Sequence, residues 1–301
     1  MIAHIVRYAE IGLKGRNRRR FEDRLAANMR AALLRAAISD FSIKRYPGRF
    51  IVSAASDVTE PLRTVFGIAS ISTAQECDLE LEGIKKAVLE LLAQKTFESF
   101  RVTVQRLNKA FPISSQEMAA ALGAEIVAAM GKRVSLKAFD LNVQLELMDR
   151  AYIFFDRAKG LGGLPVGIEG VALLLLEDQS SLAAGWLAMK RGVALVAVGE
   201  QQLELTGLER FAPERIQFVK LVKLEEIDLI ASEHNAKALI VNDTMDRIRE
   251  WRTALLVLRP LVGEEDAVSA ILELLAGGGI DAFLEAYARA GMPGLAKGGV
   301  K

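Results

Sequence analysis

The residues best placed to do chemistry follow a short apolar run in the second half of the chain. Residues 171–176 (VALLLL) are predicted to form a buried strand, residues 177–181 (EDQSS) a tight polar turn, and the following residues an amphipathic helix that ends at Gly192. Beyond the carboxyl ends of strands in an open α/β sheet, helix N-termini offer free N–H groups to a phosphate. Here the turn has no glycine, and Glu177 and Asp178 stand where an anion would bind. The turn is therefore either a working ligand site or one that has been abandoned.

The length and composition of the chain limit the class of protein to which it can belong. With 301 residues, of which 51% are hydrophobic and 26% charged, the chain can bury a core and is expected to form two or three domains. No apolar run is long enough to span a bilayer and the N-terminus has no signal-peptide layout, so we expect a cytoplasmic protein without membrane contact. The single cysteine, Cys77, excludes an internal disulfide and is expected to be a small buried residue. His4 and His234 do not give the ligand spacing of a zinc site.

Charge is distributed unevenly along the chain. Residues 1–75 carry thirteen basic and six acidic side chains, residues 76–165 twelve of each, and residues 166–301 fourteen basic and twenty acidic. Because a polyanion is held chiefly by Lys and Arg, a nucleic-acid surface is expected at the basic front of the chain. On charge alone, a solvated basic helix explains the pattern equally well.

Residues 1–77 are predicted to form a ferredoxin-like domain. Strands, turns and helices follow in a β-α-β-β-α-β order, with Pro47-Gly48 as the turn of a hairpin and Asn17 as the expected cap of the long first helix. Leu25, Met29, Leu33 and Leu34 recur at helical spacing on that helix. The predicted elements cover residues 2–8, 18–37, 41–46, 50–54, 58–66 and 70–77.

Residues 78–165 are predicted to form a second small α/β domain. Ser114 with Glu117 three residues later has capping-box spacing, which gives both a structural role without RNA. The glycine-rich residues 160–167 are expected to be a linker, and they are no dinucleotide fingerprint because no helix starts there. The predicted elements are helices at 81–94 and 114–130 and strands at 100–107, 142–148 and 151–155.

Residues 166–301 are predicted to form a doubly wound parallel sheet, because strands and helices alternate. After the segment described first, strands are expected at 194–198, 238–241 and 255–258, and helices at 213–232, 244–253 and 266–275, with one last helix beyond the three glycines at 277–279.

Four motifs resemble the tRNA 4-thiouridine synthetases, or tRNA sulfurtransferases. They are RYAEIGLKGRNRRRFE (7–22), FRVTVQRLNKAFPISSQEM (100–118), GLGGLPVGIEG (160–170) and LAMKRGV (187–193), in family order and spacing. The resemblance implies a ferredoxin-like domain, a tRNA-binding THUMP domain and an adenylating pyrophosphatase-loop domain. In that family, ATP activates uridine 8 of tRNA and a cysteine persulfide supplies the sulfur.

The nucleotide loop departs from the family pattern. The family's Ser-Gly-Gly-x-Asp-Ser lets glycine backbone wrap a phosphate. Here the matching residues are Leu176, Glu177, Asp178, Gln179, Ser180 and Ser181. A carboxylate about 4 Å from a phosphate charge costs roughly 4 kcal/mol at an effective dielectric constant of about 20. We therefore expect Glu177, Asp178 or Ser180 to cap the helix in place of phosphate, with no cofactor bound.

Two further segments also differ from the family pattern for a nucleotide site. Residues 241–253 (VNDTMDRIREWRT) lack the glycine and glutamines of the family's second nucleotide segment. Residues 259–268 (RPLVGEEDAV) still resemble the family's Arg-Pro-Leu region, but beyond them no relay cysteine segment and no rhodanese domain are recognised.

The resemblance places RNA contacts in the first two domains. The expected contacts to phosphates or the acceptor end are Lys14, Arg16, Arg18, Arg19, Arg20, Arg106, Lys109, Ser114 and Lys132. The leading hypothesis is a tRNA-binding protein of this family with a degenerate ATP site, which acts alone or with a sulfur-donor or modification enzyme, and family likeness suggests a homodimer.

Two alternatives stay open. The first is an active sulfurtransferase that makes 4-thiouridine at position 8 of tRNA with ATP, Mg²⁺ and an external persulfide donor. The second is a hydrolase that uses Ser180 or Ser181 with His234, although a lone histidine on a polar helix end is more often solvated.

Overall fold

The computed structural model describes residues 1–8, 10–13 and 17–290. Two compact units are defined by contacts within the chain. The first unit comprises residues 1–6, 40–59 and 71–158, and the second comprises residues 7–39, 60–70 and 159 onward. The helix of the predicted ferredoxin-like domain is thus assigned to the second unit, whereas its hairpin is assigned to the first.

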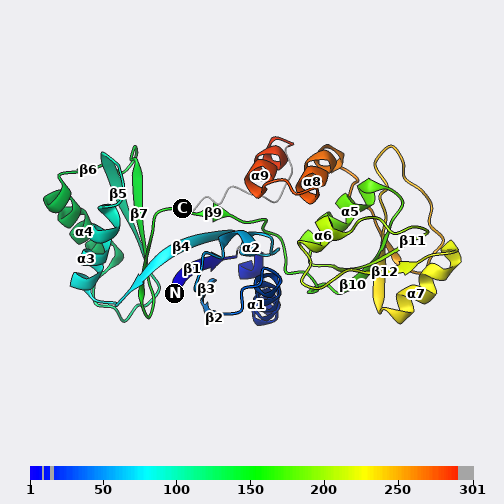
Figure 1. Cartoon of the computed structure of the whole chain (residues 1–301), viewed down its shortest axis with the longest axis horizontal. Coiled ribbons are helices and arrows are strands. Elements are labelled where there is room, and N and C mark those ends of the chain that lie inside the picture. The colour runs from blue at the N-terminus through cyan, green and yellow to red at the C-terminus, as the bar shows by residue number, and fades with distance from the viewer. Residues whose placement is uncertain (9, 14–16, 291–301) are drawn as a thin grey trace. The chain divides into compact units, whose positions relative to one another are not determined.

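The first unit is built on a single large sheet (Figure 1). Its strand order is β2-β3-β1-β4-β8-β7-β5-β6, with β9 paired to β4. Strands β4 and β8 join the predicted first and second domains into this sheet through an antiparallel pair in which Gln75 lies opposite Ile153. The strands are β1 (Ile2–Arg7), β2 (Phe41–Tyr46), β3 (Arg49–Ala54), β4 (Ser70–Cys77), β5 (Ser99–Arg106), β6 (Arg133–Val134), β7 (Leu141–Leu147), β8 (Ala151–Phe154) and β9 (Ala158–Lys159).

Helices α3 (Leu81–Leu92) and α4 (Ser115–Met130) pack on one side of strands β5, β7 and β8. Their buried positions recur at helical spacing, as in Ile84, Val88 and Leu92 of α3, so each helix presents one apolar stripe to the sheet. A smaller cluster that includes Ile5 and Phe154 forms a separate core of the first unit.

The second unit contains a five-stranded parallel sheet in the order β12-β11-β10-β13-β14. The three central strands, β11, β10 and β13, are almost wholly apolar because helices can cover both faces of a parallel sheet. They are β10 (Val171–Leu175), β11 (Ala194–Gly199), β12 (Gln217–Lys220), β13 (Ala236–Ile240) and β14 (Leu256–Leu258).

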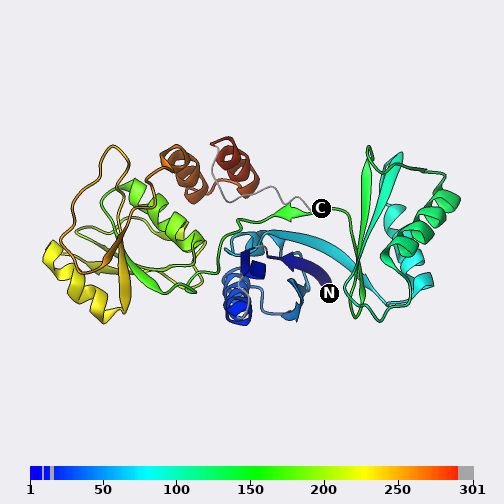
Figure 2. The same ribbon diagram turned by 180° about the vertical axis from the view of Figure 1, so that it is seen from behind.

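The two faces of this sheet have separate cores. One core contains residues of α5 (Gln179–Lys190), α6 (Thr206–Glu209), α8 (Val268–Leu275) and α9 (Ile280–Arg289), with Trp186 of α5 fully buried. The other core lies under α7 (Ile227–Glu233), which is on the opposite side of the sheet from α5 in both views (Figure 1, Figure 2). The remaining short helices are η1 (Glu10–Leu13), α2 (Thr59–Arg63), η3 (Leu224–Glu226) and η4 (Glu265–Ala267).

Helix α1 (Arg18–Arg35) packs within the second unit through its polar and apolar side chains. Asn28 donates a hydrogen bond from Nδ2 to the carbonyl of Val166 at 3.1 Å, and Arg35 donates to the carbonyl of Ala212. Leu25, Met29 and Leu33 are fully buried as expected, but Leu34 is 59% exposed. The predicted cap was wrong, because Asn17 has helical backbone angles and makes no side-chain capping bond.

The glycine-rich segment at 160–167 is packed and is not a loose linker. Backbone bonds join Gly162 N to the carbonyl of Ile68 at 2.8 Å and Leu164 N to the carbonyl of Lys190 at 2.9 Å. Gly163 has a φ of +77°, and a Cβ there would lie 2.3 Å from the Lys190 carbonyl oxygen. Glycine is therefore required where this segment meets the end of α5.

Two predicted helices were wrong. Residues 213–232 form strand β12 and helix α7, because residues 217–220 pair with β11 and leave only a short helix before β13. Residues 244–253 form no helix, and Asp243 accepts hydrogen bonds from Arg249 N and Trp251 Nε1 that hold this segment in an irregular path. In both places tertiary contacts overrode a helical pattern.

Candidate functional site

The turn between β10 and α5 lies at the carboxyl edge of the parallel sheet, as predicted. β10 is flanked by β11 on one side and β13 on the other, so the turn is at the point where the strand order reverses. Such a point is where open α/β sheets place their ligands. The five strands therefore place the turn at the usual ligand position of an open α/β sheet.

Asp178 fills the N-terminus of α5. Its carboxylate accepts hydrogen bonds from Ser180 N at 2.8 Å and from the Ser180 hydroxyl at 2.5 Å. The Ser181 hydroxyl accepts in turn from Glu177 N at 3.1 Å. The backbone N–H groups of Glu177 and Ser180 are thus bound by side-chain oxygens of the same turn, which confirms the expected cap.

Capping also determines the charge of Asp178. Burial alone would raise its pKa, but the two hydrogen bonds from Ser180 bring the pKa below the usual value for a carboxyl group. Asp178 is therefore ionised at neutral pH and places a negative charge at the positive end of the α5 dipole.

Arg249 covers the turn from the neighbouring segment after β13. Its guanidinium forks onto the Glu177 carboxylate, with both N···O distances at 2.7 Å, and donates from Nε to Asp243 at 2.6 Å. It also lies 4.5 Å from the centre of the Trp251 ring. The hydrogen bond with Glu177 and that with Asp243 raise the pKa of Arg249 above its usual value. The guanidinium is therefore fixed over the turn by two carboxylates and a ring.

Asp243 is the centre of this network. It is fully buried and accepts hydrogen bonds from Arg249, from Trp251 Nε1 at 3.1 Å and from Arg259 Nε at 3.1 Å. Burial raises its pKa, and the bonds from Trp251 and Arg249 lower it to a net value below the usual range. Asn242 adds a link to the turn by donating to the Ser180 hydroxyl at 3.1 Å.

These three residues were missed by sequence reasoning. Arg249 lies in the segment 244–253 that was expected to be a helix, and Asn242 and Asp243 lie just before that segment, so their convergence on the turn was not visible. The only signal was that this segment replaces the family's second nucleotide-site motif. The hydroxyls of Ser180 and Ser181 are committed to the turn and to Asn242, which gives the hydrolase alternative no support.

The predicted RNA-contact residues of the N-terminal motif are partly engaged inside the protein. Lys14 and Arg16 lie outside the described residues. Arg18 donates to Glu22 at 2.8 Å and to the Tyr8 hydroxyl at 2.8 Å. Arg20 donates to the carbonyl of Ile168 at 3.1 Å, whereas Arg19 is exposed.

The predicted contacts in the first unit have different roles. Arg106 donates to the carbonyl of Phe111 at 2.8 Å and so shapes the loop that precedes α4. Ser114 forms the expected capping box with Glu117. Lys132 pairs with Glu98 at 3.0 Å, and Lys109 is exposed on the loop after β5.

A hollow of about 470 Å³ brings Arg106 and Lys109 together. Tyr46 at the end of β2 also lines it, together with Leu107 and Met148 from the turns after β5 and β7. Tyr46 donates a hydrogen bond from its hydroxyl to Asp149 at 2.5 Å, which holds its ring in place. Sequence reasoning missed Tyr46 because no motif marks it.

Within the described part of the chain, no group of three or more His, Cys, Asp or Glu side chains is arranged to hold a metal ion. No described helix has the length and apolar character needed to cross a membrane. Cys77 is partly buried, and burial raises the pKa of its thiol.

Comparisons with known proteins agree with this architecture. Residues 3–72 match the ThiI ferredoxin-like domain, and residues 80–156 match the THUMP domain. A probable tRNA sulfurtransferase of Thermococcus kodakarensis is 33% identical over 86% of this chain and 83% of its own length. Another from Moorella thermoacetica is 42% identical over 64% of this chain, and the alignment spans about half of that relative, 51%.

Two solved structures have the same fold. The protein PH1313 from Pyrococcus horikoshii Ot3 is similar over 97% of this chain and all of its own, with a TM-score of 0.80 and 28% identity. A 4-thiouridine synthetase, solved as an RNA complex with bound ATP, covers 92% of this chain and 87% of its own, with a TM-score of 0.74 and 26% identity. With its ferredoxin-like, THUMP and parallel-sheet parts in this order, the chain belongs to the tRNA sulfurtransferase family.

Proposed function

We propose that this chain is a tRNA-binding member of the family whose nucleotide site is closed by its own side chains. The observation that carries the proposal is the fork of Arg249 onto Glu177 above the capped N-terminus of α5. The chain would then bind tRNA through its N-terminal and THUMP parts, alone or with a partner enzyme. Its domains are taken as residues 1–77, 78–165 and 166–301.

The RNA half of the proposal is supported by the THUMP match and by the hollow at Tyr46. RNA-binding proteins combine cations for phosphates with aromatic rings on which unpaired bases stack. Lys109 and Tyr46 provide these two groups in one hollow, and Leu107 and Met148 add apolar lining. We assign the contact to Lys109 in preference to Ser114, because the Ser114 hydroxyl is committed to the helix cap.

The proposal that the nucleotide site is closed is supported by the charge of the turn and by the space that its side chains occupy. Glu177 and Asp178 hold two carboxylates where phosphates would lie, and the guanidinium of Arg249 neutralises one of them from within the protein. A bound phosphate would have to displace the Asp178 carboxylate from its hydrogen bonds with Ser180. The residues of the turn thus do not fit ATP, and we derive no reaction step from it.

The tRNA proposal is tested by fluorescence anisotropy with labelled tRNA at several salt concentrations. We expect affinity to fall steeply with salt, and Lys109→Ala to weaken binding about fivefold and to reduce the slope of log affinity against log salt by about one. Lys86→Ala is the matched control, because Lys86 is exposed on α3 and does not line the hollow. Affinity that is absent, or that does not change with salt, would contradict tRNA binding.

ATP binding is tested separately by equilibrium dialysis of labelled ATP with Mg²⁺. We expect no saturable binding at concentrations of about 1 mM, which is the upper end of typical substrate constants. Saturable binding that Asp178→Ala abolishes would overturn the closed site without touching the RNA proposal.

The second candidate function is an active sulfurtransferase with an external persulfide donor. The parallel sheet favours it, because β10 keeps the position at the switch of strand order. ATP–pyrophosphate exchange and 4-thiouridine in tRNA from a deletion strain decide between the two. Restoration of thiouridine by this chain, but not by its Asp178→Ala variant, would establish the active enzyme.

A further inference from the structure

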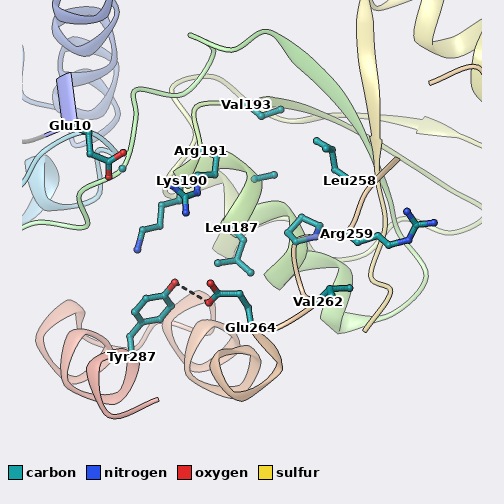
Figure 3. A pocket seen from close by; sticks show the side chains of 13 residues that line it. Glu10, Leu187, Lys190, Arg191, Val193, Leu258, Arg259, Val262, Glu264 and Tyr287 are labelled. Carbon is teal, nitrogen blue, oxygen red and sulfur yellow. Dashed lines mark hydrogen bonds between the residues drawn. The ribbon is translucent and has the colours of Figure 1, made fainter. Parts of the chain in front are cut away.

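A cavity of about 430 Å³ lies beside the C-terminal end of α5 in the second unit. It is lined by charged groups of both signs and by apolar side chains (Figure 3). The charged groups are Lys190 at the end of α5, Arg191 directly after it, Glu10 of η1, and Glu264, which precedes η4. Arg259 also lines the cavity, but its guanidinium donates to the buried Asp243. Neither the RNA proposal nor the capped turn uses this cavity.

Lys190 is buried to an unusual degree for a lysine. It is only 7% exposed, and its ammonium has no hydrogen-bond acceptor among the described residues. The ammonium lies 4.5 Å from the centre of the Tyr287 ring and 5.4 Å from that of Trp186. The rings stabilise its charge but accept none of its N–H groups in a normal hydrogen bond, so burial leaves these donors unsatisfied.

Carboxylates lie on the other sides of the same cavity. Glu264 accepts a hydrogen bond from the Tyr287 hydroxyl at 3.4 Å, shown as the dashed line in Figure 3. In that view the Lys190 side chain extends between Glu10 and Tyr287. The cavity therefore offers both an ammonium that lacks an acceptor and carboxylates that can accept from a cation.

An amphoteric lining selects among ligands by charge. A simple anion would be attracted by Lys190 and Arg191 but repelled by Glu10 and Glu264. A simple cation would be attracted by the two carboxylates and repelled by the two basic groups. A zwitterion satisfies both sets. Leu187, Val193, Leu258 and Val262 add an apolar wall that matches a hydrocarbon side chain.

We propose that this cavity binds a free α-amino acid with an apolar side chain. Its carboxylate accepts hydrogen bonds from Lys190, its ammonium donates to Glu264 and Glu10, and its side chain lies against the apolar wall. The cavity volume of about 430 Å³ is within the usual size of small-molecule sites. This binding is independent of the RNA and nucleotide proposals.

Proton uptake gives the site a second signature. Burial, with a smaller contribution from Arg191, lowers the pKa of Lys190 to about 8. A carboxylate ligand favours the charged amine and raises that pKa, so affinity is full below pH 8 and falls as the pH rises through it. Binding near pH 8 must therefore take up protons, which a purely structural lysine does not require.

The test is isothermal titration calorimetry of the full chain with L-leucine and L-phenylalanine. N-acetyl-leucine lacks the ammonium and leucinamide lacks the carboxylate, and we expect each to bind at least about tenfold more weakly than leucine. Titration near pH 8 in buffers of different ionisation enthalpy measures the proton uptake.

Two substitutions test the two ends of the ligand. We expect Lys190→Met and Glu264→Gln each to weaken leucine at least about tenfold, whereas Lys237→Met, an exposed lysine on β13, leaves affinity unchanged. Circular dichroism establishes whether the variants fold. If Lys190→Met does not fold, Glu264→Gln still tests the proposal. The proposal is overturned if neither amino acid binds, if the amide and acetyl forms bind as well as leucine, or if neither folded variant differs from wild type.

Discussion

Replacing Arg249 by methionine removes the guanidinium that closes the β10–α5 turn and keeps most of its hydrocarbon length. The structure assigns it a bidentate ion pair with Glu177 and a bond to Asp243, which has no exposed surface. Breaking a fully buried pair costs about 3–5 kcal/mol. The Arg249 and Glu177 side chains are 25% and 32% exposed, and Asp243 retains its hydrogen bonds from Trp251 and Arg259. We therefore expect the substitution to lower the free energy of unfolding by about 2 kcal/mol.

A double-mutant cycle isolates the contact itself. Glu177→Gln alone should destabilise the second unit by about 1 kcal/mol, and the coupling energy between the two substitutions should be about 1 kcal/mol. Arg252→Met is the matched control, because Arg252 is exposed in the same segment, and it should change stability by less than about 0.5 kcal/mol.

Urea unfolding followed by tryptophan fluorescence measures this coupling. The chain has two tryptophans, Trp186 and Trp251, and both belong to the second unit, so the signal does not report the first. A coupling energy within about 0.3 kcal/mol of zero would refute the reasoning that Arg249 and Glu177 hold the site closed.

Three further predictions concern the cap, a buried ion pair and a glycine. Asp178→Ala should lower the free energy of unfolding of the second unit by about 1 kcal/mol at neutral pH. Because the folded pKa of Asp178 is depressed, this contribution is present above the usual carboxyl pKa and is lost as pH falls below about 4, which urea titrations at several pH values measure. Arg49→Met should destabilise the first unit by about 3 kcal/mol, because Glu146 is 1% exposed, and faster thiol labelling of Cys77 in urea reports it. Gly163→Ala should lower the melting temperature of the second unit by several degrees, because its Cβ would meet a backbone oxygen at 2.3 Å. Unchanged values would contradict the respective contacts.

Local patterns in the sequence were sufficient for most of the regular elements. Leu25, Met29 and Leu33 predicted the buried stripe of α1, and the Ser114-to-Glu117 spacing predicted the capping box of α4. Both depend on residues three or four apart, so the chain itself brings them together. The family resemblance then supplied the order of the parts, and the comparisons confirmed the family.

Patterns failed where long-range contacts compete with local propensity. Residues 217–220 became strand β12 because β11 offers a parallel partner, and this pairing ends the long helix expected there. Residues 244–253 follow Asp243, whose bonds to Arg249 and Trp251 replace the hydrogen bonds of a helix. Strand β11 lies too far back in the sequence to be visible in a local window, whereas Asp243 is six residues from Arg249 but at a spacing that no helical pattern marks.

The ligand site shows most clearly what the sequence alone determines and what depends on the tertiary structure. The sequence alone determined that the turn after β10 lacks glycine, carries Glu177 and Asp178, and lies at the carboxyl edge of a parallel sheet. It also predicted that a side chain of the turn would cap α5, because Asp178 and Ser180 are local to that helix end. Only the tertiary structure decided that Arg249, about seventy residues away, forks onto Glu177, and that Lys190 is buried without an acceptor. Both depend on where distant segments pack, and no local pattern encodes that packing.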